Sequence, residues 1–368
     1  MNRRAYIDWL RGLAVVIMIE AHTIDAWTVT DPAVRSQATF KFLQFLAGWA
    51  APLFLFLAGV SVSMAAASHL RKGKSVAEAS AAVQRRGWQI LGLAFLFRVQ
   101  SFMLSPTQPI AGLLKVDILN IMGLAMVAAA WCWGRGRSDR ERTLWLLVPS
   151  AAIVIIGQFT PGWSWPDVIA GPLEGYMRLI EGTGNFMLAP WSAFVLVGAW
   201  LGRLLLVNRD ATADKAFHLR LGLIGAAILA LALVSASLPE ITPHSVYWQT
   251  STSFVLLRLG VMSMLLSLAW LWMQRPRATR WSPMVLFGQT SLFVYWVHVE
   301  IVYGFPTYPI RHEFSIARAL EAYAVFTLLM LWLAVKWNQR AQGPLIPVFL
   351  KAGGPEGPPV HTRGAAGR

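Results

Sequence analysis

Residues 8–22 read DWLRGLAVVIMIEAH, a long apolar run that nevertheless carries Asp8, Arg11, Glu20 and His22. Further apolar runs of about 20 residues follow it, and this is the length that an α-helix needs to cross the hydrocarbon of a bilayer. The chain has 368 residues, of which 56% are hydrophobic and 14% charged, and its mean hydropathy is +0.52. A soluble domain of this size cannot keep so much apolar surface away from water. The sequence therefore predicts an all-α fold, a polytopic transmembrane helical bundle.

The apolar runs predict about ten membrane-spanning helices. We place them at residues 6–27, 42–67, 87–104, 111–133, 143–159, 189–207, 217–238, 250–273, 283–304 and 315–336. They form one membrane domain, residues 1–345, and we expect the Gly/Pro-rich stretch 346–368 to be a disordered tail. The first run is expected to stay as a helix, because its ionisable side chains and the lack of a small-residue cleavage site are not typical of a signal peptide.

The basic residues alternate from one gap between helices to the next. Of the 32 lysines and arginines, 23 lie in every second gap and in the two terminal segments, and six lie in the other gaps. This asymmetry is the positive-inside pattern, which predicts a multi-pass protein of the plasma (inner) membrane with both termini in the cytoplasm. The net charge of +14 is then explained by orientation and by contact with anionic lipid headgroups, so we expect no nucleic-acid partner.

Arg11 and His22 are eleven residues apart on the first predicted helix. Eleven steps rotate a helix by about 1100°, three turns plus roughly 20°, so the two side chains share one face about 16 Å apart along the axis. Glu20 points the opposite way by the same count. Asp8 lies three residues before Arg11, where the two charges can neutralise each other on the helix surface. One helix thus presents a guanidinium near the cytoplasm and an imidazole near the outer side.

Other helices bring ionisable groups to the depth of His22. An ionisable group at the membrane centre costs roughly 2.5–3.5 kcal/mol on insertion scales, so several at one depth predict a shared polar cavity. The candidates are Arg98, Asp117, Arg258, His298 and Glu300. His298 and Glu300, two residues apart, do not face the same way on a helix.

The residues alone leave several interpretations open. A histidine near a helix end is often only a hydrogen-bonded structural group, and Arg98 with Asp117 can be a structural ion pair between neighbouring helices. His22 and His298 can also be read as the two axial ligands of a haem, which would leave Arg11 unexplained. A proton-coupled transporter or flippase for a sugar- or lipid-like solute would use the same cavity and the same histidine.

Four stretches resemble signatures of the transmembrane acyltransferases, a group that includes acyltransferase-3 proteins and heparan-α-glucosaminide N-acetyltransferase-like proteins. Residues 8–22 are similar to the first-helix signature, in which Arg11 and His22 fill an arginine, ten residues, histidine pattern. Residues 52–64, PLFLFLAGVSVSM, resemble the second-helix signature, with a glycine at position 59 that allows close helix contact. The stretches VDILNIMGL and GQTSLFVYWVH resemble the Asp-x-Leu-x-x-x-Gly and Gly-x-x-Ser-Leu-x-x-Tyr-x-x-His elements of the glucosaminide-type proteins.

The chain departs from this family in one respect. The lysosomal glucosaminide enzyme carries its active histidine in the loop after the first helix, whereas residues 23–51 contain no histidine. If the chain uses a catalytic histidine, the resemblance therefore leaves His22, His298 or a histidine elsewhere in the chain to serve.

The resemblance implies an integral membrane acyltransferase. Such an enzyme would move an acyl group, most simply acetyl, from cytoplasmic acetyl-CoA or another acyl-CoA to a hydroxyl or amine of an extracytoplasmic sugar or lipid-linked acceptor. No metal is expected. Its partners would be membrane lipids and the small-molecule, glycan or lipid acceptor, with a homodimer as one option.

The resemblance also implies roles for the ionisable groups. The phosphates of CoA would be held by Arg11 with Asp8, since arginine suits phosphate. The proton of the acceptor would go to His22, because the ordinary pKa of histidine lies near neutral pH. The other expected catalytic residues are Asp117, Arg98 and His298, and the expected substrate-binding residues are Arg258 and Glu300. Either Arg98 or Arg258 would stabilise the oxyanion that forms.

Overall fold

The computed structural model of the chain describes most of the predicted membrane domain. The described residues are 5–104, 110–163, 173–178, 184, 186–207, 209–238, 242–243, 245–275 and 281–341. Their regular elements are helices, joined by two isolated bridges, Thr28 to Phe314 and Val116 to Gly184. The all-α prediction is confirmed. The expected tail, residues 346–368, lies outside the described residues.

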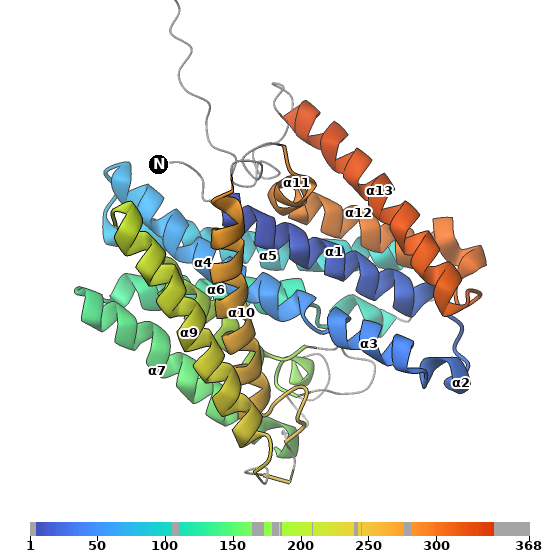
Figure 1. Ribbon diagram of the computed structural model, residues 1–368, viewed down its shortest axis with the longest axis horizontal. Coiled ribbons are helices and arrows are strands. Elements are labelled where there is room, and N and C mark those ends of the chain that lie inside the picture. Colours follow the sequence, from blue (N-terminus) through green and yellow to red (C-terminus); the bar gives the residue numbers. More distant parts are fainter. Residues whose placement is uncertain are drawn as a thin grey trace, which may run out of the picture.

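The helices follow the predicted runs closely, with breaks that the sequence did not indicate (Figure 1). They are α1 (Ala5–Trp27), α2 (Pro32–Arg35), α3 (Ala38–Ala47), α4 (Ala50–Arg71), α5 (Val76–Leu104), α6 (Ile118–Arg135), α7 (Asp139–Gly157), α8 (Leu188–Leu205), α9 (Ala211–Ser235), α10 (Thr252–Met273), α11 (Pro283–Gln289), α12 (Ser291–Tyr303) and α13 (Ile316–Ala341). Short 3-10 turns are η1 (Ile110–Leu114), η2 (Thr160–Gly162), η3 (Glu174–Tyr176) and η5 (Phe305–Ile310).

Six helical segments of the described chain are long and apolar enough to cross a membrane. They are Ala38–Arg71, Ile118–Arg135, Leu188–Leu205, Ala211–Ser235, Thr252–Met273 and Ile316–Arg340, and the bent pair α11–α12 is a seventh if it counts as one span. The bundle is therefore that of a membrane protein. The count of ten spans and the cytoplasmic position of both termini stay predictions.

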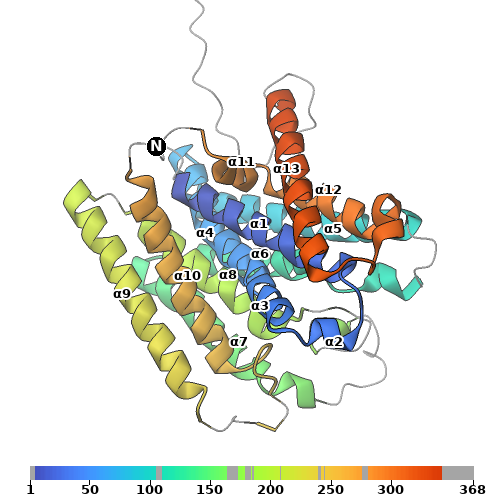
Figure 2. The same cartoon turned by 45° about the vertical axis from the view of Figure 1, so that its right-hand side comes forward.

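Two helices at opposite edges of the bundle, α9 and α13, are mostly exposed along their most apolar stretch, of which only 22% is buried in each (Figures 1 and 2). Leu223 on α9 is 70% exposed, and Val325 on α13 is 69% exposed. Contiguous exposed apolar surface of this kind mixes poorly with water and suits contact with lipid. These helices are expected to face the hydrocarbon, while α1, α4 and α8 supply the interior.

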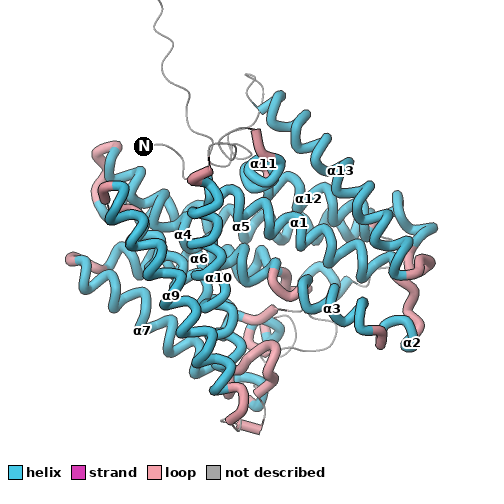
Figure 3. Tube along the Cα trace, viewed as in Figure 1, coloured by secondary structure: helices cyan, strands magenta, loops and turns pink. Residues whose placement is uncertain are grey.

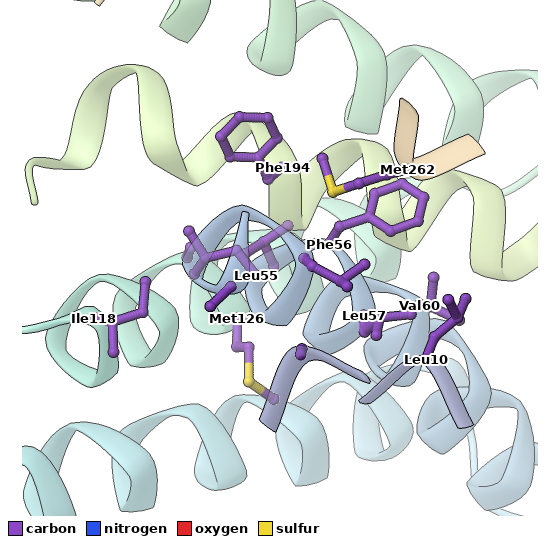
Figure 4. Close-up of a cluster of buried hydrophobic side chains, with 14 of the residues drawn as sticks. Leu10, Leu55, Phe56, Leu57, Val60, Ile118, Met126, Phe194 and Met262 are labelled. Atoms are coloured by element: carbon purple, nitrogen blue, oxygen red, sulfur yellow. The ribbon is translucent and has the colours of Figure 1, made fainter. Parts of the chain in front are cut away.

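The interior is centred on α4 (Figure 4). Leu55, Phe56 and Val60 of α4 are fully buried, and Phe194 of α8 packs against them. The two helices approach closely because Gly59 faces the backbone of α8, where a Cβ would overlap the carbonyl oxygen of Val195. The prediction that this glycine allows close helix contact is confirmed.

The predicted continuous helix over residues 283–304 is wrong. The structure breaks it into α11 and α12, which are bent by 87° at Thr290. Figure 3 shows α11 nearly end-on while α12 runs across the view. The hydroxyl of Thr290 donates to the carbonyl oxygen of Leu286 at 2.9 Å and so satisfies one of the carbonyls at the end of α11.

Backbone contact between α11 and α1 accounts for this bend. A Cβ at Gly288 would overlap the carbonyl oxygen of Asp8, and a Cβ at Gly12 would overlap that of Met284. The two glycines let the helices touch backbone to backbone. Held there, the chain must turn at Thr290 for α12 to reach the far end of α1.

We predict that Gly288→Ala separates α1 from α11. The added methyl has no space, so the variant should lose about 3 kcal/mol of stability, at the upper end of what overpacking usually costs. The measurement is the thermal unfolding midpoint of the purified protein in detergent. Gly92→Ala on α5 is the matched control, because nothing lies within 4 Å of its added Cβ, and it should gain up to about 1 kcal/mol from helix propensity. Equal midpoints for the two variants would contradict the proposed backbone contact.

Candidate active site

Two histidines from opposite ends of the sequence meet at the C-terminal end of α1. The Nδ1 atom of His22 on α1 lies 2.9 Å from the Nε2 atom of His298 on α12. The two rings are nearly parallel, with 15° between their planes and 5.0 Å between their centroids. His298 is completely buried, and His22 is partly buried. Two axial ligands of one haem lie on opposite sides of the iron, so metal–nitrogen bonds of about 2.0 Å would place their nitrogens about 4 Å apart rather than at 2.9 Å.

A backbone carbonyl determines which nitrogen of each ring carries hydrogen. The Nδ1 atom of His298 lies 2.8 Å from the carbonyl oxygen of Val294. A carbonyl only accepts, so this Nδ1 donates, and Nε2 of the neutral ring is then an acceptor. It follows that Nδ1 of His22 donates to His298, which leaves Nε2 of His22 without hydrogen and with a lone pair. That is the state of a general base.

Aromatic rings and a carboxylate surround the histidine pair. The ring of Tyr303 stands edge-on to His22 with 5.6 Å between centroids, and Tyr295 packs edge-on to His298 at 5.9 Å. The hydroxyl of Tyr295 donates to Oδ2 of Asp117 at 3.0 Å. Through this bond the start of α6 is tied to α12 beside His298.

Asp117 joins three helices. Its Oδ2 atom forms an ion pair with Arg98 of α5 at 2.9 Å as well as accepting from Tyr295. Its other oxygen caps α6 by accepting from the backbone of Ile118, and its own N–H donates to the Asn120 side chain. The interpretation of Arg98 and Asp117 as an ion pair between helices is confirmed. The pair also lies next to the histidines, so it belongs to the same cluster.

The residues that follow Asp117 reach the loop after α7. The side-chain amide of Asn120 donates to the hydroxyl of Tyr176 at 2.9 Å. Burial raises the pKa of Tyr176, and the hydrogen bond from Asn120 partly opposes this shift. Tyr176 is therefore protonated at neutral pH and ties the described part of this loop to α6.

Arg11 contacts a different part of the structure. Its guanidinium forms an ion pair with Asp8 at 3.1 Å and donates to the hydroxyl of Ser61 on α4. The predicted neutralisation of Asp8 by Arg11 is confirmed. The Arg11 side chain is still 23% exposed, towards the N-terminal end of α1.

Two candidates do not join the histidine cluster in the described structure. Arg258 on α10 donates to the carbonyl oxygen of Gly48 and packs among aromatic rings, away from the histidines. Glu300 lies two residues beyond His298, and its buried Oε1 atom has no hydrogen-bond partner among the described residues. Of the groups expected at one depth, the described structure thus connects His22 with His298 and Arg98 with Asp117, and the shared cavity stays a prediction.

Several contributing residues were not assigned roles from the sequence. Ser61 and Val294 stand within two of the quoted stretches, but no role was assigned to the Ser61 hydroxyl or the Val294 carbonyl, and Tyr303 lies outside those stretches. Tyr295 lies in the GQTSLFVYWVH stretch, three residues before His298, and this helical spacing was the one indication that the two side chains are neighbours. In the described ranges no group of three or more His, Cys, Asp or Glu residues is placed to hold a metal ion.

A family model covers the first two thirds of the chain. The model described as heparan-alpha-glucosaminide N-acetyltransferase, catalytic, matches residues 3–237. The matched segment includes His22, Arg98 and Asp117 and ends before Arg258 and His298. A search of the curated proteins found no match.

We predict that Asp117→Asn destabilises the protein by about 3 kcal/mol, because it leaves Arg98 mostly buried without its counter-ion. The side chains of this pair are only 18% and 14% exposed. Asp139→Asn is the matched control, since its carboxylate also pairs with an arginine, Arg203, but is 88% exposed. That variant should cost less than about 1 kcal/mol. The thermal unfolding midpoints should differ accordingly; coincident midpoints would show that the Asp117 pair is not structural.

Proposed function

The chain belongs to the heparan-alpha-glucosaminide N-acetyltransferase family, and from this premise we propose that it is a membrane acetyltransferase with His22 as its general base. The supporting observation is a chain of two hydrogen bonds, here called the relay, in which His22 donates to His298 and His298 donates to the carbonyl of Val294. It presents the unprotonated Nε2 of His22 for proton transfer. Family membership favours this activity over the alternative of a proton-coupled transporter, which would use the same histidine.

The proposed reaction moves one proton in and out of His22. The proton of the acceptor hydroxyl or amine passes to Nε2 of His22 while the acceptor oxygen or nitrogen bonds to the thioester carbonyl carbon. When the carbon–sulfur bond breaks, His22 returns this proton to the leaving thiolate, and the ring ends neutral. General acid–base catalysis of this kind contributes about 10²–10⁴-fold.

His298 supports the charged state of His22. Once Nε2 is protonated, His22 is an imidazolium whose Nδ1 hydrogen still points at the lone pair of His298 Nε2, 2.9 Å away. A hydrogen bond from a charged donor is stronger than one from a neutral donor. His298 therefore stabilises the intermediate more than the resting state, which is the requirement for a rate effect.

Arg98 is the candidate for stabilising the oxyanion. Its Nη2 is occupied by Asp117 at 2.9 Å, whereas its buried Nε has no hydrogen-bond partner among the described residues. A fixed, unoccupied N–H in the cluster that includes the base can meet the charge that develops on the carbonyl oxygen. Asp117 and Tyr295 would then orient Arg98 and the histidine pair.

The donor and acceptor follow from the same proposal. Acetyl-CoA or another acyl-CoA would approach from the cytoplasm, with its phosphates at the partly exposed Arg11, which Asp8 and Ser61 orient. The acceptor would be a hydroxyl or amine of an extracytoplasmic sugar or lipid-linked molecule. This arrangement assumes an inner-membrane protein with cytoplasmic termini. Glu300, with an unpartnered oxygen, is the remaining candidate for acceptor binding.

The test is acetyl transfer from acetyl-CoA to glucosamine by the purified protein, followed as release of free CoA. We expect His22→Ala to lower kcat by about 10²–10⁴-fold with little change in KM for acetyl-CoA. His298→Ala should lower kcat less, because the base remains but its preferred tautomer is lost. His69→Ala, at the end of α4, should leave the rate unchanged. A folded His22→Ala variant with native turnover would refute the assignment of the base.

A further inference from the structure

One arginine inside the bundle has no carboxylate partner. Three arginines lie five or more residues from either end of a predicted span, and two of these form ion pairs, Arg11 with Asp8 and Arg98 with Asp117. No acidic oxygen of the described chain lies within ion-pair distance of Arg258. A guanidinium in an apolar region normally requires such a partner, because water is no longer there to solvate its charge.

The surroundings of Arg258 satisfy its charge only in part. The side chain is buried, with 5% of the residue exposed. The ring centroid of Phe254 lies 3.8 Å from the guanidinium carbon, with Trp49 at 5.1 Å and Trp248 at 5.9 Å. Aromatic faces attract the cation, but they do not replace strong acceptors for its N–H groups.

Most of the donors of Arg258 are unused. Its Nη2 donates to the carbonyl oxygen of Gly48 at 3.1 Å, at the junction between α3 and α4. Its Nε and Nη1 atoms are buried and have no hydrogen-bond partner among the described residues. A cation with several open donors beside a single neutral acceptor is a site for an anion with several acceptor oxygens.

The site lies at the end of α10 that is remote from the start of α1. Trp270, twelve residues further along α10 or about 18 Å, stacks on His218, which contacts Tyr6 at the start of α1. At the Arg258 end, Trp248 is 52% exposed, and its ring packs edge-on against that of Phe45, with 6.3 Å between centroids. These two rings form an exposed rim next to the guanidinium.

We propose that Arg258 binds an oxyanion, a phosphate or carboxylate group carried either by a lipid headgroup or by a soluble anionic sugar. The group would enter over the rim of Phe45 and Trp248, and its oxygens would accept from Nε and Nη1. The cluster makes no described contact with His22 or His298. The proposal therefore goes beyond acetyl transfer and does not depend on it.

Binding without acetyl-CoA tests the site. In the soluble arm, inorganic phosphate and glucuronate are titrated into the purified protein, with glucose as the neutral match for glucuronate. In the lipid arm, short-chain phosphatidylglycerol is added, with an uncharged lipid as its match. The readout in both arms is the rise in the thermal unfolding midpoint, from which an apparent affinity is taken.

We expect Arg258→Gln to weaken binding of the anion at least tenfold, while Arg318→Gln, an exposed arginine on α13, leaves it unchanged. Gly48→Ala is the second variant, because its Cβ would lie 3.2 Å from Nη2 of Arg258. It shifts the guanidinium without removing it and should weaken binding several-fold.

The results in the two arms either identify the source of the anion or overturn the proposed site. An effect of Arg258→Gln in the soluble arm indicates a soluble anion, and one in the lipid arm alone indicates a headgroup. If Arg258→Gln does not fold, the Gly48→Ala comparison decides. Unchanged affinity of Gly48→Ala, or of a folded Arg258→Gln variant, in both arms overturns the proposal. Loss of acetyl transfer has no bearing on this result.

Discussion

The backbone contact between α1 and α11 is the constraint on which the histidine pair depends. Glycines on both helices, Gly12 and Gly288, remove the side chains that would keep them apart. The contact holds α11 across the start of α1, and the 87° bend that follows sends α12 along to its far end. Only then does His298, ten residues after Gly288, come within 2.9 Å of His22. Backbone packing at one end of the first helix thus brings His298 into contact with His22 at the other end.

The same apolar surroundings explain how the ionisable groups are arranged. Polar groups within a bundle interior are retained where another group satisfies them, and here the partner usually comes from a distant helix. Asp117 connects Arg98 with Tyr295, and His298 accepts a hydrogen bond from His22. Each connection fixes a side chain in one orientation, which is what a site needs for a base and an oxyanion donor to act on one carbonyl carbon.

Much of the fold could be predicted from the sequence, because apolar runs of membrane length leave few alternatives. The break at Thr290 could not be, since the polar residues 289–291 interrupt the apolar run only briefly and the bend comes from contact with α1. His22 and His298 were each identified, yet their contact depends on packing between segments 276 residues apart. Arg258 was assigned to the same cavity from its depth in the membrane. Depth does not fix which helices meet, and Arg258 contacts Gly48 and aromatic rings instead of the histidines.

The most direct test of the account is the protonation state of His22, measured by nitrogen NMR on protein with ¹⁵N-labelled histidine, assigned with His22→Ala and His298→Ala. At neutral pH we predict hydrogen on Nδ1 of His22, none on its Nε2, and a through-bond ¹⁵N–¹⁵N coupling from Nδ1 of His22 to Nε2 of His298. That pattern would establish the relay and the free lone pair of the base. Hydrogen on Nε2 of His22, or the lack of any coupling between the two rings, would contradict it.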